Sequence, residues 1–230
     1  MKARYVIAVL LCALSPLSLS AADNSNLNAR IKDATDVIRQ IMMTPDKSIP
    51  NSIARQATCV GVIPSVKKAA FIVGGSYGQG VVTCRTRKGW SAPVFIRLAG
   101  GSVGFQIGGQ ATDLVLVAVN DKGFQDLLRS KFKIGADAAA AAGPVGRNTA
   151  AATDLRLNAE LLTYSRSKGL FAGIDLNGAV VSQNNDDTNA FYGGTVENFD
   201  KVLHGSVPVP AAAQPFVRAI GKYFVAAHAN

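Results

Sequence analysis

Acidic side chains, histidine and long apolar segments are scarce in this chain of 230 residues. Glu160 and Glu197 are its only glutamates, and both histidines, His204 and His228, lie near the C-terminus. Histidine is the usual base for a serine or cysteine nucleophile, and hydrolysis by two carboxylates needs acids held close together. No spacing in the sequence brings two acids together. We therefore expect no enzymatic activity, no catalytic residue, no metal and no cofactor.

Residues 1–22 are predicted to be a signal peptide. Lys2 and Arg4 precede the apolar run 6–14, and Ser20-Ala21-Ala22 supplies small residues for cleavage before Asp23. The apolar run is too short for a membrane span, and no later segment reaches the ~20 apolar residues that a span requires. We expect a periplasmic or secreted protein that can associate peripherally with a membrane.

The basic balance of the chain predicts anionic partners. The net charge is +9, and it falls to +7 when Lys2 and Arg4 leave with the signal peptide. Charged residues make up only 17% of the chain, so the excess lies on a fairly apolar body. Such a surface suits lipid headgroups, nucleic acid or acidic polymers. Export makes nucleic acid the least suitable of these, and we expect none to bind.

Cys59 and Cys84 are the cysteines that remain after cleavage. In an oxidising compartment they are expected to form a disulfide. Closing a loop of this separation would stabilise the fold by roughly 3 kcal/mol. The alternative is a pair of buried free thiols. Metal or redox chemistry has little support, because the sequence has no CxxC motif and no histidine near these cysteines.

Residues 27–43 have apolar side chains at helical spacing, which predicts an amphipathic helix that packs on a sheet or lies on a membrane. A second, short helix is expected from Pro50. Residues 120–128 and 186–192 are also expected to form helices. The alanine run 138–142 fits a helix or a tightly packed strand.

Between residues 66 and 119, apolar and β-branched runs alternate with glycines, which predicts short strands joined by tight turns. Asn177-Gly178 predicts a hairpin between residues 170–176 and 179–181. Strands so close in sequence favour antiparallel pairing. The expected fold is α+β, a strongly curled, mainly antiparallel β-sheet or barrel with flanking helices. Further strands are expected at residues 59–63, 69–73, 81–86, 94–98, 103–107, 114–119, 132–134 and 155–164.

After Gly194 the composition changes to a proline- and alanine-rich linker, residues 207–215, and an amphipathic helix, residues 214–227. We expect a domain over residues 23–194, including the N-terminal helices, and a C-terminal extension over residues 195–230. The last helix either docks on the domain or serves as an arm.

Five segments in order resemble the SYLF domain, a lipid-binding family. They are KKAAFIVGGSYGQGVV, GWSAPVFIRLAGGSVGFQIGGQATDLVLV, AAGPVGR, SRSKGLFAG and Phe191-Tyr192-Gly193, and the resemblance covers residues 31–193. It implies binding of phosphoinositide-like headgroups through a basic surface. For an exported chain, anionic phospholipid or lipopolysaccharide is the expected ligand. The glycine loops lack the GxxxxGK[ST] and GxGxxG orders, so they predict turns of a scaffold and no nucleotide site.

Basic residues at turns and strand ends, with the single tryptophan beside one of them, are the candidates for holding a headgroup. The alternatives are a non-enzymatic structural or interaction protein of the cell envelope and an enzyme acting on envelope lipid or glycan. The lipid-binding candidates are Lys67, Lys68, Arg85, Arg87, Lys88, Trp90, Arg166 and Lys168.

Overall fold

The computed structural model describes residues 19–44, 48–70, 74–102, 111–123, 130–146, 159–167, 170–173, 176–196 and 198–225. Its helices are α1 (Leu19–Met42), α2 (Asn51–Gln56), α5 (Asn185–Phe191), α6 (Phe199–Leu203) and α7 (Gln214–Tyr223), with the 3-10 turn η1 (Ala211–Ala213). The strands are β1 (Cys59–Ala70), β2 (Gly74–Thr86), β3 (Gly89–Trp90), β4 (Val94–Ser102), β5 (Thr112–Ala118), β6 (Lys131–Lys133), β7 (Ala140–Ala142), β8 (Leu161–Ser167), β9 (Leu170–Gly173) and β10 (Val180–Gln183).

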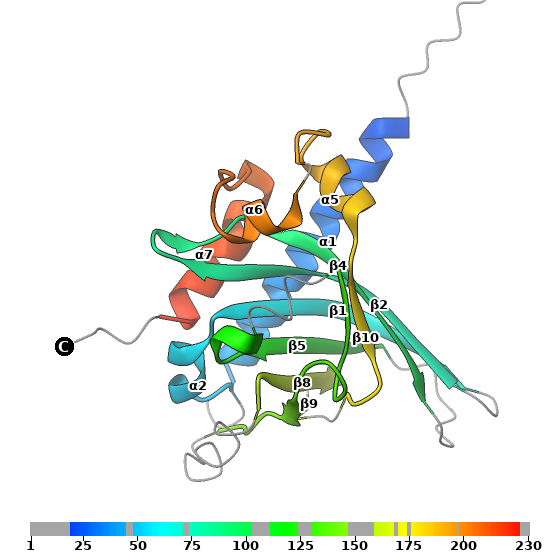
Figure 1. Ribbon diagram of the computed structural model, residues 1–230, viewed down its shortest axis with the longest axis vertical. Coiled ribbons are helices and arrows are strands. Elements are labelled where there is room, and N and C mark those ends of the chain that lie inside the picture. Colours follow the sequence, from blue (N-terminus) through cyan, green and yellow to red (C-terminus); the bar gives the residue numbers. More distant parts are fainter. Residues whose placement is uncertain are drawn as a thin grey trace, which may run out of the picture.

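The described strands form one strongly curled sheet with helices around it, a half-barrel (Figure 1). Its order is β6-β10-β4-β2-β1-β5-β8-β7, with β3 on β2 and β9 on β8. All of these pairs are antiparallel except β7 with β8. The expected α+β class with a curled, mainly antiparallel sheet is confirmed.

One face of the sheet, the α1 face, packs against α1, α5 and α7. Alternation along β1 sends Val60 and Val62 to this face, where they meet the buried stripe of α1. Burial shows that α1 packs on the sheet, so the alternative that its apolar side lies on a membrane is wrong. The buried stripe consists of Leu27, Ile31, Ala34, Ile38 and Ile41, as the helical spacing predicts.

The opposite face, the α6 face, carries a second core. Cys59 and Ile63 of β1 point to it and pack with Val202 and Leu203 of α6. Strand β5 contributes to both cores, because its successive residues alternate between the α6 face and the α1 face. Both of its sides are buried, as is typical of a strand with a continuous apolar run.

The C-terminal helix docks on the domain. Phe216, Ile220 and Phe224 are fully buried in the core that α1 also closes, and α7 contacts α1 directly. An arm extending from the domain is therefore wrong for the described residues 214–225. In the described part of the chain, no helix has the length and apolar character that crossing a membrane would require.

Two local predictions need correction. Residues 59–63 and 69–73 were expected as two strands, but β1 runs through Cys59–Ala70 with a bulge. The turn at Asn177-Gly178 exists, with Gly178 at φ +87°, but the hairpin is wrong. Strand β9 pairs with β8, whereas β10 pairs with β4 and β6, because Val181 fills the α6-face core next to Leu98 and Phe132.

Other predictions are settled only in part. The alanine run contains a strand, β7, and no helix in the described residues 138–142. The expected strand 103–107, residues 124–128 of the expected helix 120–128 and residues 155–158 of the expected strand 155–164 lie outside the described residues.

Candidate functional site

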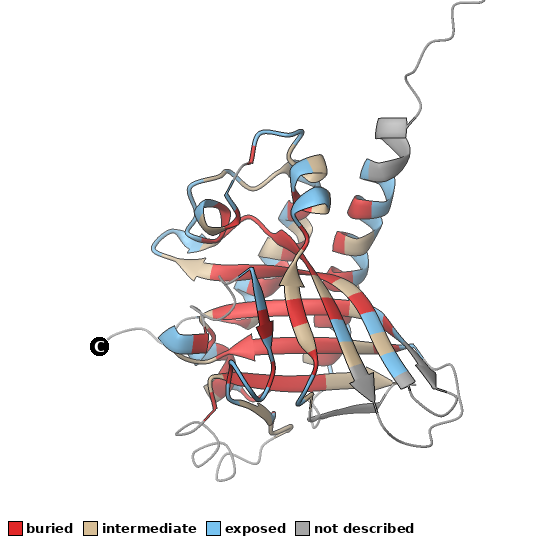
Figure 2. Cartoon of the chain, turned by 45° about the vertical axis from the view of Figure 1, so that its right-hand side comes forward, coloured by how far each residue is buried: buried red, intermediate tan, exposed pale blue. Residues whose placement is uncertain are grey.

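Beyond α1 and α5, the α1 face of the sheet is open and polar. On β4, Phe95 is buried against α5, where its ring centroid lies 5.3 Å from that of Phe191. Arg97 and Ala99 follow two and four residues later and project from the same face. Arg97 is half-buried and Ala99 is exposed. Figure 2 shows strands changing from buried to half-buried and exposed towards one end.

Two neighbouring rows of paired residues cross the sheet in this open area. Because directly paired residues project from the same face, their side chains lie on one surface. One row is Lys67, Tyr77, Ala99, Val180 and Lys133. The other row is Gln79, Arg97, Ser182 and Lys131.

We call Lys67, Tyr77, Arg97, Lys131 and Lys133 the basic face. Lys67, Lys131 and Lys133 are exposed, the Arg97 side chain is 38% exposed, and Tyr77 is 49% exposed. At about 4.8 Å between strands, the row from Lys67 to Lys133 spans roughly 19 Å. Four cations from β1, β4 and β6 therefore share an area of the size that a few lipid headgroups cover.

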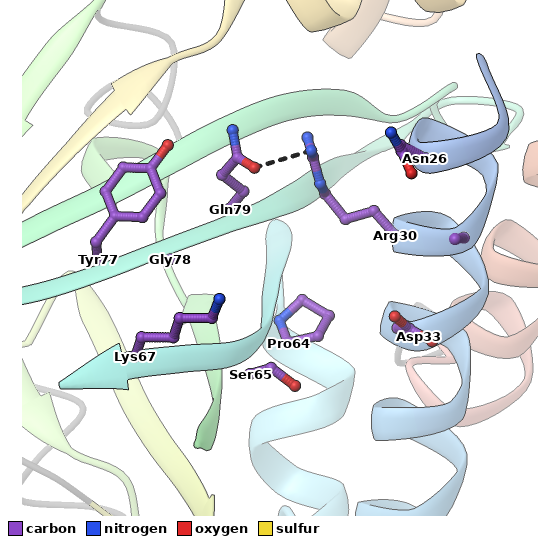
Figure 3. Close-up of a pocket in the computed structure, with 10 residues that line it drawn as sticks. Asn26, Arg30, Asp33, Pro64, Ser65, Lys67, Tyr77, Gly78 and Gln79 are labelled. Carbon is purple, nitrogen blue, oxygen red and sulfur yellow. Dashed lines mark hydrogen bonds between the residues drawn. The ribbon is translucent and has the colours of Figure 1, made fainter. Parts of the chain in front are cut away.

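Two hollows lie on either side of Tyr77. The first, about 580 Å³, is lined by Arg30, Lys67 and Gln79 among others, and Figure 3 shows these side chains around it. The second, about 560 Å³, is lined by Lys131 and Ser182 among others. Tyr77 lines both hollows, so its ring stands between two recesses that each contain a lysine.

A β-bulge in β1 points Lys67 towards the basic face. Val62 packs on the α1 face, so regular alternation would send Val66 there and Lys67 to the α6 face. Instead, Val66 is buried on the α6 face and Lys67 pairs with Tyr77. The register shifts at this bend, and Ser65 has φ 51°.

Asp113 holds the bulge in place. Its Oδ1 accepts a hydrogen bond from the backbone N–H of Ser65 at 2.9 Å. Its Oδ2 accepts bonds from Nε and Nη2 of Arg166, at 2.9 and 2.6 Å. Arg166 also donates to Gln40 of α1. Asp113 thus stabilises the backbone that orients Lys67.

A polar network borders the basic face and fixes α1 and α5 against the sheet. Arg30 of α1 pairs with Asp187 of α5, donates to Gln79 at 2.9 Å and lies 5.4 Å from the Phe95 ring centroid. Arg97 donates to Asn184, the cap of α5. These contacts hold Arg30 at the first hollow and Arg97 on the strand between Gln79 and Ser182.

Arg85 and Trp90, both predicted to bind lipid, have structural contacts inside the fold. The Arg85 guanidinium donates to the carbonyl oxygens of Ala57 at 3.0 Å and Phe224 at 2.9 Å, and it lies 4.6 Å from the Trp90 ring centroid. Burial lowers the pKa of Arg85. Trp90 is half-buried and meets Phe224 edge to face at 6.2 Å.

The structure brings only some of the predicted residues together. Arg87 and Lys88 are exposed at the β2–β3 turn, at the opposite end of β2 from Tyr77. Arg166 lies at the Lys67 end but is bonded to Asp113. The Lys68 side chain and the whole of Lys168 lie outside the described residues. Binding of lipid by any of these residues stays a prediction.

Comparison with known proteins decides the family. Residues 99–223 match the model of the Ysc84 family, described as "Las17-binding protein actin regulator". The chain belongs to the Ysc84 (SYLF) family. It is similar to rat SH3 domain-containing YSC84-like protein 1, with 34% identity over 86% of this chain and 60% of that protein. It is also similar to Protein YSC84 of Saccharomyces cerevisiae, with 31% identity over 84% of this chain and 43% of that protein.

This Ysc84-family chain thus spans three fifths or less of the length of these curated relatives. The family match extends to Tyr223, thirty residues beyond the resemblance visible in the sequence. It therefore includes α6 and α7, in agreement with the burial of both helices in the two cores.

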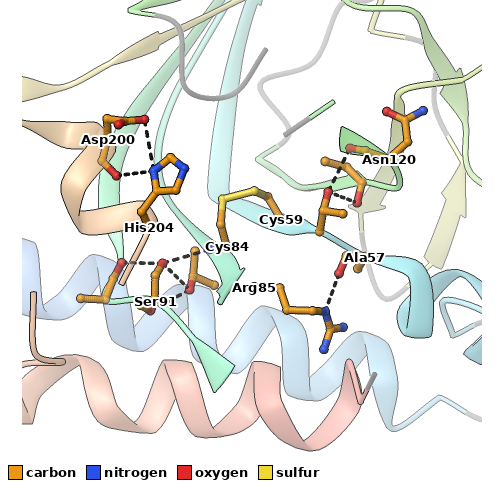
Figure 4. Close-up of a disulfide and its surroundings, with 12 residues drawn as sticks. Ala57, Cys59, Cys84, Arg85, Ser91, Asn120, Asp200 and His204 are labelled. Atoms are coloured by element: carbon orange, nitrogen blue, oxygen red, sulfur yellow. Dashed lines mark hydrogen bonds and ion pairs between the residues drawn. A yellow bond between two sulfur atoms is a disulfide. The ribbon is translucent and has the colours of Figure 1, made fainter. Parts of the chain in front are cut away.

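The disulfide of this family member lies at the far end of the hairpin from the basic face. Cys59 and Cys84 are paired across β1 and β2 and bonded, with Sγ atoms 1.95 Å apart (Figure 4). The disulfide prediction is confirmed, and the alternative of free thiols is wrong. The Ser91 hydroxyl accepts a hydrogen bond from the backbone N–H of Cys84 at 3.0 Å. This contact fixes the residue that follows β3 against the disulfide.

The interpretation of the sequence missed Arg30 and Arg97 as candidates. The alternation Phe95-Arg97-Ala99 contains the relevant pattern, since a polar residue follows a buried one on the same face. Lys131 and Lys133 alternate with the buried Phe132 on the exposed side of β6, and their approach to Tyr77 depends on β10 pairing with β4 and β6.

Proposed function

We propose that this protein binds anionic lipid headgroups, those of anionic phospholipids or phosphoinositide-like lipids, at the basic face. The observation that carries the proposal is the convergence of Lys67, Arg97 and the two lysines of β6 on an open part of the sheet. Each Lys or Arg near an anionic membrane contributes ~1 kcal/mol. Arg97 is already paired with Asp186 at 3.5 Å, so the three exposed lysines alone would strengthen binding by roughly a hundredfold, and salt would weaken it.

Tyr77 supports a membrane surface over a small soluble anion. It is one of the few large apolar side chains that are exposed among the described residues, and it stands between two lysine-containing hollows. A tyrosine ring has an apolar body and a polar hydroxyl, so it suits the headgroup layer. The basic side chains around it would contact neighbouring phosphates.

Vesicle co-sedimentation tests the proposal. Vesicles with about a third phosphatidylglycerol should pellet the protein at low salt, and vesicles of phosphatidylcholine alone should not. Lys131→Glu/Lys133→Glu should weaken binding at least tenfold. Arg218→Glu/Lys222→Glu, which reverses two exposed charges on α7, should change it less than threefold. Equal pelleting of both vesicle types, or of neither, would exclude the basic face as a headgroup site.

The comparisons support a second candidate, a non-enzymatic interaction protein. The family description names Las17 binding and actin regulation, and the relatives are named for SH3 domains. A protein that pellets with no vesicle, yet retains a protein partner that Lys131→Glu/Lys133→Glu releases, would favour this candidate. For an exported chain, that partner would belong to the cell envelope.

Export to a periplasm or out of the cell is part of the proposal. The disulfide supports it, because such bonds persist in oxidising compartments. Cleavage after Ala22 would also retain the buried residues of α1 among the described side chains 24–42, which begin with Leu27. N-terminal sequencing of the mature protein should give Asp23, and a mature chain beginning near Met1 would contradict export.

A further inference from the structure

The basic face is not the only exposed group of cations in the described residues. Arg87 and Lys88 occupy the two-residue turn between β2 and β3. The turn is well defined: the Thr86 hydroxyl accepts the backbone N–H of Lys88 at 3.2 Å and donates to the Gly89 carbonyl at 3.1 Å. Gly89, at φ 122°, completes it. The two cations therefore project from a fixed support. We call Arg87 and Lys88 the turn patch.

The turn patch borders a hollow of about 750 Å³ that is separate from those beside Tyr77. Thr58, Asp121 and His204 line it together with the turn. His204 follows α6 and lies 3.3 Å from a carboxylate oxygen of Asp200. Figure 4 shows His204 near the Cys59–Cys84 disulfide, which joins β1 and β2.

The turn patch and the basic face lie at opposite ends of the sheet. Ten residues of β2 and its turn separate Tyr77 from Arg87, which corresponds to about 30 Å of extended chain. That distance exceeds the Debye length of about 8 Å at physiological salt several times, so the two groups act independently. In Figure 1, the β2–β3 hairpin and the far ends of β2 and β4 point to opposite sides of the molecule.

The basic face and the hollow beside the turn patch also adjoin different faces of the sheet. The basic face is on the α1 face, whereas the hollow at the turn lies towards α6, which packs on the α6 face. Gly205, which follows α6, lies against this turn: a Cβ added to it would be 2.9 Å from Cγ2 of Thr86. Helices α1, α5 and α7 cover the rest of the α1 face and stand above the sheet. A flat bilayer in contact with the basic face would rest against these helices and slope away from the turn patch.

We propose that the protein bridges two anionic lipid surfaces, with the basic face on one membrane and the turn patch on the other. This inference rests on the proposed function for the first contact and adds the second. Two cations bind weakly, at roughly fivefold for each side chain. However, many copies on one membrane would present their turn patches together, and a second membrane would meet them at high effective concentration.

Binding and bridging are separate measurements on the full mature chain. Co-sedimentation with vesicles of phosphatidylglycerol and phosphatidylcholine measures binding, and dynamic light scattering of the same mixture measures clustering. We expect the unmodified protein to bind and to increase the mean vesicle diameter at least threefold. Arg87→Glu/Lys88→Glu should bind within twofold of it but leave the vesicles single. Arg218→Glu/Lys222→Glu should still cluster them.

The outcomes separate the two proposals. Binding by the unmodified protein without clustering overturns bridging and leaves headgroup binding intact. Clustering that persists in Arg87→Glu/Lys88→Glu also overturns it, because contact would then come from self-association or another surface. No binding at all overturns the proposed function itself. Circular dichroism of each variant verifies that the fold is retained.

Discussion

The Arg85 guanidinium donates a hydrogen bond to the carbonyl oxygen of Phe224, 139 residues further along the chain, at 2.9 Å. The same side chain bonds Ala57 and lies over Trp90. One residue of β2 therefore connects the α2–β1 junction, the β2–β3 hairpin and the end of α7. Its loss leaves two backbone carbonyl groups without these bonds.

Arg85→Ala should lower the free energy of unfolding by about 2–3 kcal/mol, since hydrogen bonds from a charged group and the cation–π contact are lost together. Urea denaturation measures this. Arg87→Ala, two residues away and exposed, is the matched control and should change stability by less than about 0.5 kcal/mol. Equal effects of the two substitutions would show that Arg85 does not stabilise the docked helix.

Gly143→Ala should be strongly destabilising. A Cβ at this position would come within 2.0 Å of Cζ of the buried Tyr164 ring. The ring and β7 cannot both keep their places, and overpacking of this kind costs typically 1–3 kcal/mol. Thermal unfolding measures the loss. At Gly221, where the nearest atom is 3.8 Å from an added Cβ, alanine should be tolerated. A fully stable Gly143→Ala would contradict the close packing.

Stability should decline in alkaline solution. Tyr192 donates its hydroxyl to the Pro93 carbonyl at 2.6 Å, and burial raises the pKa of this phenol, as it does for Tyr164. Because the folded pKa lies above the unfolded value of about 10, the stabilisation is complete below pH 10 and is lost as the pH rises beyond it. Urea denaturation between about pH 8 and 11 should show the decline, and Tyr192→Phe should make it shallower. An unchanged slope would exclude Tyr192 as a source.

Asp113→Ala should affect both stability and binding. It removes the acceptor of the Ser65 N–H and one partner of Arg166, so we expect a loss of about 2 kcal/mol. Vesicle binding should fall several-fold, because the bulge that turns Lys67 outward is no longer fixed. Ser65→Gly leaves Asp113 in place to accept the backbone N–H of residue 65, and glycine tolerates the φ of 51° better than serine does. This variant should be neutral or stabilising by up to about 1 kcal/mol. It should also retain vesicle binding. If Asp113→Ala binds vesicles as tightly as the unmodified protein, binding does not depend on the bulge that orients Lys67.

Local patterns predicted much of the fold. The stripe of α1, the two-sided burial of β5, the pairing of the two cysteines and the outward lysines of β6 all follow from periodicity or from residue chemistry. These features depend on neighbours in sequence or on a single pair of residues.

Features that depend on long-range pairing were not predictable in the same way. The Asn177-Gly178 turn indicated a local hairpin, but β10 gains more by filling the core between β4 and β6. Arg85 and Trp90 resembled surface residues because their partner, Phe224, is so distant in sequence. The basic face depends on a bulge and on five strands brought into register, and no single segment contains that information.

The packing of α7 on α1 has a consequence for how the chain acquires its structure. The first and last helices close the same core, so that core stays incomplete until Phe224 has left the ribosome. Completion of this core is therefore expected only after synthesis, and the many long-range contacts of the fold favour slow folding.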